Sequence, residues 1–200
     1  HAPIARRLGL HSIGVELDDL CFKTLHPRKH LVIERKIKKQ YGNQRKTISL
    51  IKSEIESRLK FEQINATVEG RQKEPSSIYN KMKIKSRKFS EVLDMHAFRV
   101  VVENTNACYQ ALGHIHSLYK PIPLKFKDYI SAPKPNGYQS LHTVLIGPRK
   151  MFIEVQIRSQ EMDFISEYGI AAHWHYKNKD EPSKKLARNW MGSLLDIQQN

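Results

Sequence analysis

The feature that most restricts the fold is a strict alternation of apolar and polar residues at positions 152–158. The side chains of Ile153, Val155 and Ile157 point to one side, and that of Glu154 points to the other. A two-residue period is typical of a β-strand with one buried face. This segment is therefore predicted to be a strand that presents a carboxylate on its less apolar face.

A second strand is predicted at 139–146, because a short turn-rich segment separates it from 152–157 and such adjacency favours an antiparallel pair. Residues 94–102 are rich in β-branched side chains and predict a further strand, and a short one is predicted to begin near Ile64 and to end at Gly70. The helical periods lie between and before these strands. They predict helices at 13–25, at 31–61 with Gly42-Asn43 as a candidate break, from a Ser76 or Ser77 cap to about Arg87, from an Asn104 or Thr105 cap to Tyr119, and from a Ser159 cap to about Trp174.

The charge balance points to polyanionic partners. The chain has 34 Lys and Arg against 20 Asp and Glu, a formal net charge of +14. Nucleic acid and nucleotide phosphates both fit such a balance. No apolar run is long enough to span a membrane, and Cys21 and Cys108 are expected to be buried free thiols in a cytoplasmic protein.

The common phosphate-binding and metal-binding motifs do not occur. The sequence has no GxxxxGK[ST] and no GxGxxG, and it has no adjacent His-Asp pair of the kind that a phosphohydrolase metal centre would use. Phosphates must then be held by basic side chains, which are dense between residues 71 and 90 and in the loop at 121–137. Asp94 and Glu154, each assigned to a strand, are candidates to share a Mg²⁺ ion, because this ion takes oxygen ligands together with nucleotide phosphates.

Several motifs together resemble the synthetase domain of the RelA/SpoT family of alarmone enzymes. They are GRQKEPSSIYNKM, LDMHAFRVVV, KFKDYISAPKPNGYQSLHT, IEVQIRS and EYGIAAHWHYK. The resemblance implies an α+β fold like that of nucleotidyltransferases, with a mixed five-stranded sheet flanked by helices and an N-terminal helical segment. It also implies transfer of the β,γ-pyrophosphate of ATP to the 3′-hydroxyl of GDP or GTP, which makes the chain a GTP pyrophosphokinase of the stringent response.

The resemblance also assigns roles to individual residues. Asp94 matches the family's Mg²⁺-binding aspartate, and Glu154 matches its essential glutamate, either a second metal contact or the base for the 3′-hydroxyl. Tyr138 matches the ring that stacks on guanine. Arg71, Lys73 and Lys81 match residues that bind ATP. The residues that match the GDP/GTP site around Tyr138 are Lys125, Lys127, Lys134, Asn136 and His142.

The resemblance further implies a division of the chain. Residues 1–12 are expected to be the tail of an upstream hydrolase domain, 13–62 a helical connector, 63–177 the synthetase domain, and 178–200 a linker and helix toward a C-terminal regulatory region. Lys125-Phe126-Lys127-Asp128 stands where bifunctional synthetase–hydrolases carry an RxKD pattern, which favours a SpoT-like, bifunctional-type branch. No hydrolase active site is expected within these residues.

A rival interpretation is a weak or silent synthetase fold that acts as a regulatory module or binds RNA or the ribosome through its positive charge. Salt-sensitive RNA binding without nucleotide turnover would favour it. Regulatory domains of the same chain are expected partners under either interpretation.

Overall fold

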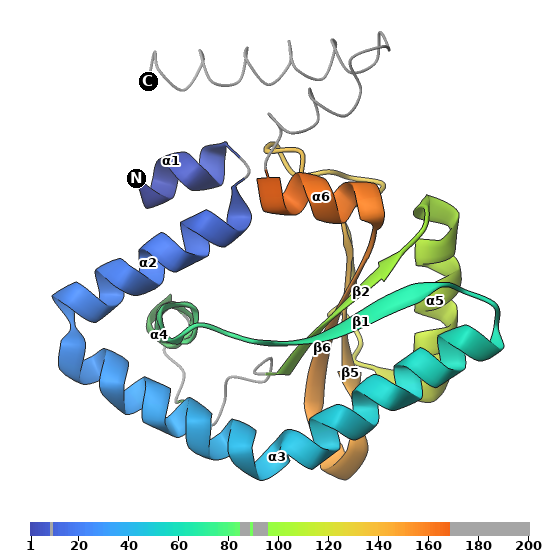
Figure 1. Cartoon of the computed structure of the whole chain (residues 1–200), viewed down its shortest axis with the longest axis horizontal. Helices are drawn as coiled ribbons and strands as arrows, with labels where there is room; N and C mark the ends of the chain where they lie inside the picture. The colour runs from blue at the N-terminus through green and yellow to red at the C-terminus, as the bar shows by residue number, and fades with distance from the viewer. Residues whose placement is uncertain (9, 85–88, 90–95, 169–200) are drawn as a thin grey trace, which may run out of the picture.

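The computed structural model describes residues 1–8, 10–84, 89 and 96–168, without the side chains of 40–44, 71 and 72. The elements follow in the order α1 (Ala2–Arg7), α2 (His11–Leu25), α3 (Pro27–Phe61), β1 (Ala66–Gln72), α4 (Pro75–Ile84), β2 (His96–Val102), α5 (Thr105–Leu118), β3 (Lys120–Pro121), β4 (Lys127–Asp128), β5 (Leu141–Ile146), the 3₁₀ turn η2 (Pro148–Lys150), β6 (Phe152–Ser159) and α6 (Gln160–Tyr168). Figure 1 shows the strands between α4 and α5, with α3 running past them and α6 at one end.

The strands form one mixed sheet in the order β1-β2-β6-β5-β3, and the two-residue β4 also pairs with β5. The predicted mixed sheet flanked by helices is confirmed, with β4 as a sixth short strand among the described residues. The predicted hairpin is confirmed as well, since β5 and β6 are antiparallel and Val144 pairs with Glu154. β2 and β6 are parallel, and Ala97 pairs with Glu154.

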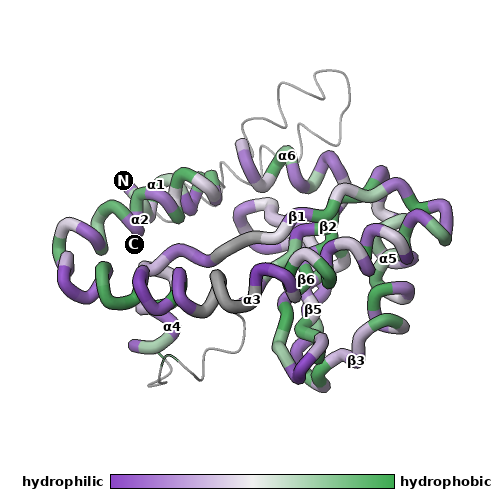
Figure 2. The backbone as a smooth tube through the Cα atoms, turned by 60° about the horizontal axis from the view of Figure 1, so that its bottom comes forward, coloured by the Kyte–Doolittle hydropathy of each residue, from purple (hydrophilic) through white to green (hydrophobic). Residues whose placement is uncertain are grey.

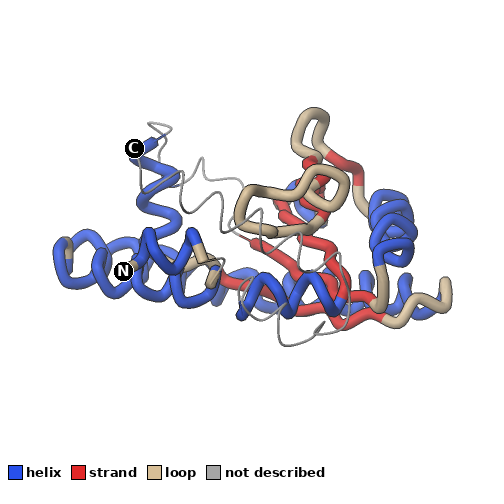
Figure 3. Tube along the Cα trace, turned by 90° about the horizontal axis from the view of Figure 1, so that it is seen from above, coloured by secondary structure: helices blue, strands red, loops and turns tan. Residues whose placement is uncertain are grey.

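One face of the sheet carries the main core. Val68, Phe98, Val155 and other alternate strand residues pack against α3 and α5 in a single buried cluster. Figure 3 shows the strands between helices, and Figure 2 shows hydrophilic and hydrophobic residues alternating along α3. The other face of β6 carries Glu154 and the polar residues at alternate positions, as the alternation predicted. α6 packs on that face, where Asp163 pairs with Arg99 and Arg158.

The predicted break at Gly42-Asn43 is wrong, because α3 runs through it without interruption. The N-terminal half of α3 buries Ile33 and Ile37 in a small cluster with Phe22 of α2 and Ile78 of α4. Its C-terminal half belongs to the main core. A glycine costs a helix about 1 kcal/mol, and burial of apolar side chains on both sides outweighs that cost.

Two predicted helix caps are confirmed, and one predicted strand end is wrong. Asn104 is the N-cap of α5, with its side chain accepting from the backbone N–H of Ala107 at 2.9 Å, and Ser159 Oγ accepts from the N–H of Met162 at the start of α6. β1 does not end at Gly70, because its pairing with β2 continues to Gln72. Among the described helices, none combines the length and apolarity of a membrane span.

The predicted start of α4 is wrong, and so is the expectation of two buried thiols. α4 begins at Pro75, which is favoured at the first helical position because proline lacks an N–H and has a helical φ. Ser76 and Ser77 therefore lie inside the first turn and do not cap it. Cys108 is buried as expected, but Cys21 is exposed, because it lies on the side of α2 away from its packing partners.

Candidate active site

The candidate site lies on the polar face of the sheet, across three strands. Arg71 of β1 pairs in register with Ala97 of β2, and Ala97 pairs with Glu154 of β6. The backbone of the first predicted ATP-side residue is thus two strands away from the predicted catalytic glutamate. Asp94 and the end of α4 beyond Ile84 fall outside the described residues.

Glu154 is the electrostatic centre of this face. Its Oε2 accepts from Lys73 Nζ at 2.6 Å, and both side chains are largely buried, with 15% and 13% exposed. Burial alone would raise the pKa of the Glu154 carboxyl, but His142, Lys73 and the charge of Lys81 together hold that pKa well below its usual range. Glu154 is therefore ionised at neutral pH, and two predicted ATP-side residues, Lys73 and Lys81, stabilise its charge.

The loop before β5 brings the predicted acceptor-side residues together through a tight turn. The N–H of Gly137 donates to the carbonyl of Lys134 at 2.8 Å, and the N–H of Lys134 donates to the carbonyl of Tyr138 at 3.2 Å. Gly137 has a φ of 76°, a conformation that glycine adopts without strain. Asn136 accepts from the Tyr138 N–H and donates to the carbonyl of Arg6 in α1, each at 3.3 Å.

Aromatic rings and a cation surround the Tyr138 side chain. Lys134 Nζ lies 4.8 Å from the centre of the Tyr138 ring and 4.7 Å from that of Tyr129. These are distances at which an ammonium is attracted by the face of a ring. An exposed lysine beside two rings can serve a phosphate and a base at the same time, which agrees with the predicted roles of Lys134 and Tyr138.

His142 joins this aromatic group to Glu154. Its Nε2 is 2.7 Å from the Tyr138 hydroxyl, and its Nδ1 is 3.6 Å from Glu154 Oε1. Burial lowers the pKa of His142, although the nearby Glu154 carboxylate opposes that effect. The imidazole is therefore neutral at neutral pH. The sequence predicts His142 beside the acceptor nucleotide, and the structure adds that His142 lies against Glu154.

An arginine to which the sequence analysis gave no role lies beneath Tyr138. Arg158 is 1% exposed, and its Nη2 donates to the Tyr138 hydroxyl at 3.2 Å and to Gln156 Oε1 at 2.9 Å. The sequence contains a sign of this placement, because Arg158 continues the alternate polar positions of β6 that begin with Glu154. A charged residue on a strand face beside a predicted site is a candidate for function.

Lys125 and Lys127, two of the predicted phosphate contacts, are exposed, and the first turn of α4 holds a carboxylate of the same chain. Lys125 precedes β4, and Lys127 is the first residue of β4 and pairs in register with His142 of β5. The first turn of α4 faces an internal anion, since the N–H of Ser76 donates to Asp19 Oδ1 at 2.9 Å and Asp19 Oδ2 is 3.0 Å from His30 Nε2.

Among the described residues, the side chains near Glu154 do not by themselves complete a Mg²⁺ site. Within the described residues no three His, Cys, Asp or Glu side chains gather as a metal site. Glu154 supplies the hard carboxylate oxygens that Mg²⁺ prefers, and it is ionised, but Lys73 and His142 contact its two oxygens. A metal at Glu154 would have to replace the Lys73 contact and would need a second acid, for which Asp94 is the candidate.

Comparison with solved structures first defines the class of fold. The chain superposes on the crystal structure of small alarmone synthetase 1 from Bacillus subtilis bound to its product pppGpp, with a TM-score of 0.58 and 21% identity, over 82% of this chain and 95% of that one. A GTP pyrophosphokinase family protein from Streptococcus pneumoniae gives a TM-score of 0.55 at 22% identity, over 81% and 90% of the two chains. The fold is thus that of the alarmone synthetases.

The family follows from the sequence comparisons. Residues 70–181 match the region found in RelA / SpoT proteins, and the chain belongs to the RelA/SpoT family. It is 48% identical to the bifunctional (p)ppGpp synthase/hydrolase SpoT of Escherichia coli K12, and 47% identical to a guanosine-3′,5′-bis(diphosphate) 3′-pyrophosphohydrolase of Vibrio cholerae. Both matches cover all of this chain but 29% of the relative. A GTP pyrophosphokinase of Myxococcus xanthus is 41% identical over the whole chain and 27% of that relative.

Proposed function

We propose that this chain transfers the β,γ-pyrophosphate of ATP to the 3′-hydroxyl of GDP or GTP and releases AMP. The observation that carries the proposal is the group formed by Lys73, Glu154, His142 and Tyr138. It joins an ionised, largely buried carboxylate to a cation on one side and to an aromatic ring on the other. A reaction between two nucleotides requires a cation that binds phosphate, a general base and a surface on which a nucleobase stacks.

The steps assign one task to each residue. Glu154 accepts the proton of the 3′-hydroxyl while the oxygen of that hydroxyl attacks the β-phosphorus of ATP. The bond between that phosphorus and the α–β bridging oxygen breaks, and AMP leaves with this oxygen. Lys73 and Lys81 offset the charge of the transferred phosphates, Arg71 stacks on adenine, and Tyr138 stacks on guanine with Lys134 and Asn136 beside it. Lys125 and Lys127 are assigned to the acceptor phosphates.

Mg²⁺ belongs to this proposal as the cofactor, held by Asp94 and Glu154. When bound, it neutralises the charge that develops on the transferred phosphates. The place of Asp94 in the sequence supports the assignment, since Asp94 comes two residues before β2, the strand that pairs in parallel with β6. Lys73 would then turn from Glu154 toward the phosphates.

The domain division and the branch are also proposed. We assign residues 63–177 to the synthetase unit, 1–12 and 13–62 to the upstream tail and connector, and 178–200 to the lead into a regulatory region. The higher identity to the bifunctional SpoT protein than to the Myxococcus pyrophosphokinase supports a SpoT-like branch in a cytoplasmic enzyme. The regulatory domains of the longer chain are its proposed partners.

The test is nucleotide chromatography after incubation with ATP and GDP, with and without Mg²⁺. We expect a Mg²⁺-dependent guanosine tetraphosphate peak and an equal amount of AMP. Glu154→Gln should lower turnover by about 10²- to 10⁴-fold, the range of a general base. Asp94→Asn should lower turnover through the loss of a metal ligand. Glu103→Gln is the matched control, because Glu103 lies just past the opposite end of β2 and contacts Asn65. Near-normal turnover in Glu154→Gln would refute the assignment, and salt-sensitive RNA binding without product would favour the rival binding module.

A further inference from the structure

The Tyr138 hydroxyl occupies a fixed place in a chain of hydrogen bonds. Arg158 Nη2 lies 3.2 Å from the hydroxyl oxygen. A guanidinium has donors and no acceptor, so the phenol oxygen must accept this bond. A hydroxyl that accepts from Arg158 still has its own proton to give, and Nε2 of His142 lies 2.7 Å away as an acceptor for it.

This direction determines which imidazole nitrogen carries the proton. A neutral histidine has one N–H and one acceptor nitrogen. If Nε2 accepts from Tyr138, the proton is on Nδ1, and Nδ1 is the nitrogen 3.6 Å from Glu154 Oε1. That distance is longer than an ordinary hydrogen bond, yet it places an N–H rather than a lone pair against the carboxylate. The opposite tautomer would set two electron-rich atoms against each other.

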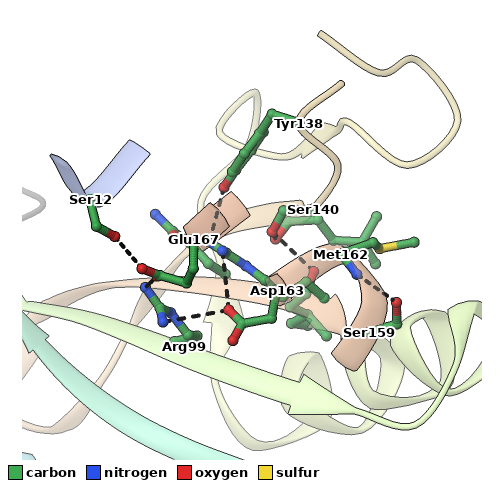
Figure 4. Close-up of polar contacts among 12 residues, drawn as sticks. Ser12, Arg99, Tyr138, Ser140, Ser159, Met162, Asp163 and Glu167 are labelled. Atoms are coloured by element: carbon green, nitrogen blue, oxygen red, sulfur yellow. Dashed lines mark hydrogen bonds and ion pairs between the residues drawn. The ribbon is translucent and has the colours of Figure 1, made fainter. Parts of the chain in front are cut away.

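Arg158 itself is held from several sides. Its Nη1 lies 3.3 Å from Asp163 of α6, and its Nη2 also donates to Gln156. Asp163 in turn lies 3.5 Å from Arg99 of β2, which pairs with Glu167 at 2.8 Å. Figure 4 shows Arg99 between Asp163 and Glu167, with Ser12 of α2 hydrogen-bonded to Glu167. The guanidinium therefore has little freedom to turn away from Tyr138.

We propose that Arg158 is a positioning residue, which directs the Tyr138 hydroxyl toward His142 and so keeps His142 in the tautomer whose Nδ1–H faces Glu154. The proposal rests on the proposed function in one respect, namely that Glu154 takes the 3′-hydroxyl proton. It gives Tyr138 two separable tasks: the ring stacks on the acceptor base, and the hydroxyl orients the group beside the base catalyst. Binding of the acceptor nucleotide and orientation of Glu154 then depend on the same side chain.

The tautomer can be measured without any activity. Nitrogen-15 NMR of histidine-labelled, nucleotide-free protein at pH 8 distinguishes a protonated ring nitrogen from an acceptor nitrogen, and His142→Gln identifies the His142 signals. We expect Nδ1 protonated and Nε2 unprotonated in the wild type. Tyr138→Phe should remove that preference. Tyr129→Phe is the matched control, because the Tyr129 ring packs 5.2 Å from the His142 ring, and it should leave both nitrogen signals unchanged.

The kinetic consequence separates the ring from the hydroxyl. Tyr138→Phe should lower kcat by about 10- to 100-fold, the usual effect of losing an orienting contact, and leave KM for GDP within about twofold. Tyr138→Ala should raise KM for GDP as well. Arg158→Lys keeps the charge and loses the planar guanidinium, so its kcat and KM should resemble those of Tyr138→Phe. If Arg158→Lys does not fold, the kinetics of Tyr138→Phe alone test the proposal.

The outcomes also separate this inference from the proposed function. A wild-type His142 protonated on Nε2, or a Tyr138→Phe protein with normal kcat, would overturn the positioning role while synthesis remained intact. Absence of synthesis in the wild type would overturn the proposed function, and the NMR measurement would still decide the tautomer.

Discussion

Removal of the charge from either Lys73 or Glu154 should destabilise the folded chain far more than removal of a surface charge. Lys73 Nζ and Glu154 Oε2 are 2.6 Å apart, and both side chains are at least 85% buried by the exposures given above. A single substitution therefore leaves an ion in a poorly solvated place with its main partner gone. His142 remains close to Glu154, but a neutral imidazole cannot replace an ammonium.

The size of the effect follows from distance and burial. At an effective dielectric constant of about 20, two unit charges at this distance attract by roughly 6 kcal/mol. Desolvation of both groups offsets part of that attraction, so a coupling free energy of about 2–4 kcal/mol is expected, within the range measured for close charge pairs. This is a large fraction of the stability of an ordinary domain.

The assay is a double-mutant cycle by urea unfolding at pH 7.5 with wild type, Lys73→Met, Glu154→Gln and the double variant. The control cycle uses Lys38→Met and Glu34→Gln, because that pair is almost as short, at 2.8 Å, but 71% and 35% exposed. The control should show no measurable coupling. Equal coupling in the two cycles would refute the argument, since burial would then make no difference, and so would a Lys73–Glu154 coupling below about 0.5 kcal/mol.

Two further predictions concern cysteine and histidine. Burial raises the pKa of the Cys108 thiol to about 12, so a thiol reagent at pH 8 should label one cysteine, the exposed Cys21, in folded protein and two in urea; two fast-reacting thiols in the folded chain would contradict the burial of Cys108. Burial also lowers the pKa of His116, whose Nε2 is 2.9 Å from Thr143 Oγ1. The unfolded chain therefore binds a proton at His116 more tightly than the folded chain does. The free energy of unfolding should be highest above the ordinary histidine pKa of about 6.5 and should decrease as the pH drops below it. His116→Gln should give a shallower fall between pH 7 and 5, and an unchanged slope would contradict this role.

Local patterns were reliable where the chemistry is local. The Asn104 cap and the Ser159 cap depend on a side chain and a backbone N–H three residues later. The β5–β6 hairpin depends on a two-residue period and a short connection. In each case the residues that stabilise the element lie within the same segment of sequence, so the pattern contains the needed information.

The errors occurred where distant residues contribute. α3 continues through Gly42 because Ile33 and Ile51, on either side of it, are buried by different partners. β1 continues past Gly70 because β2 offers it two more backbone partners. Neither partner can be identified from the local sequence, since propensity is a weak preference that tertiary contacts override.

The sequence by itself determined the family, the order of most elements and the residue types of the site. Motif residues and periodicity are properties of the amino-acid sequence, so they can be recognised without knowledge of the fold. Only the tertiary structure decided that Lys73 pairs with Glu154, that His142 stands between Glu154 and Tyr138, and that Arg158 supports the Tyr138 hydroxyl. Those contacts join residues up to 81 positions apart. They depend on strand register and on burial, and a shift of one residue in β6 would turn every one of its site side chains into the core.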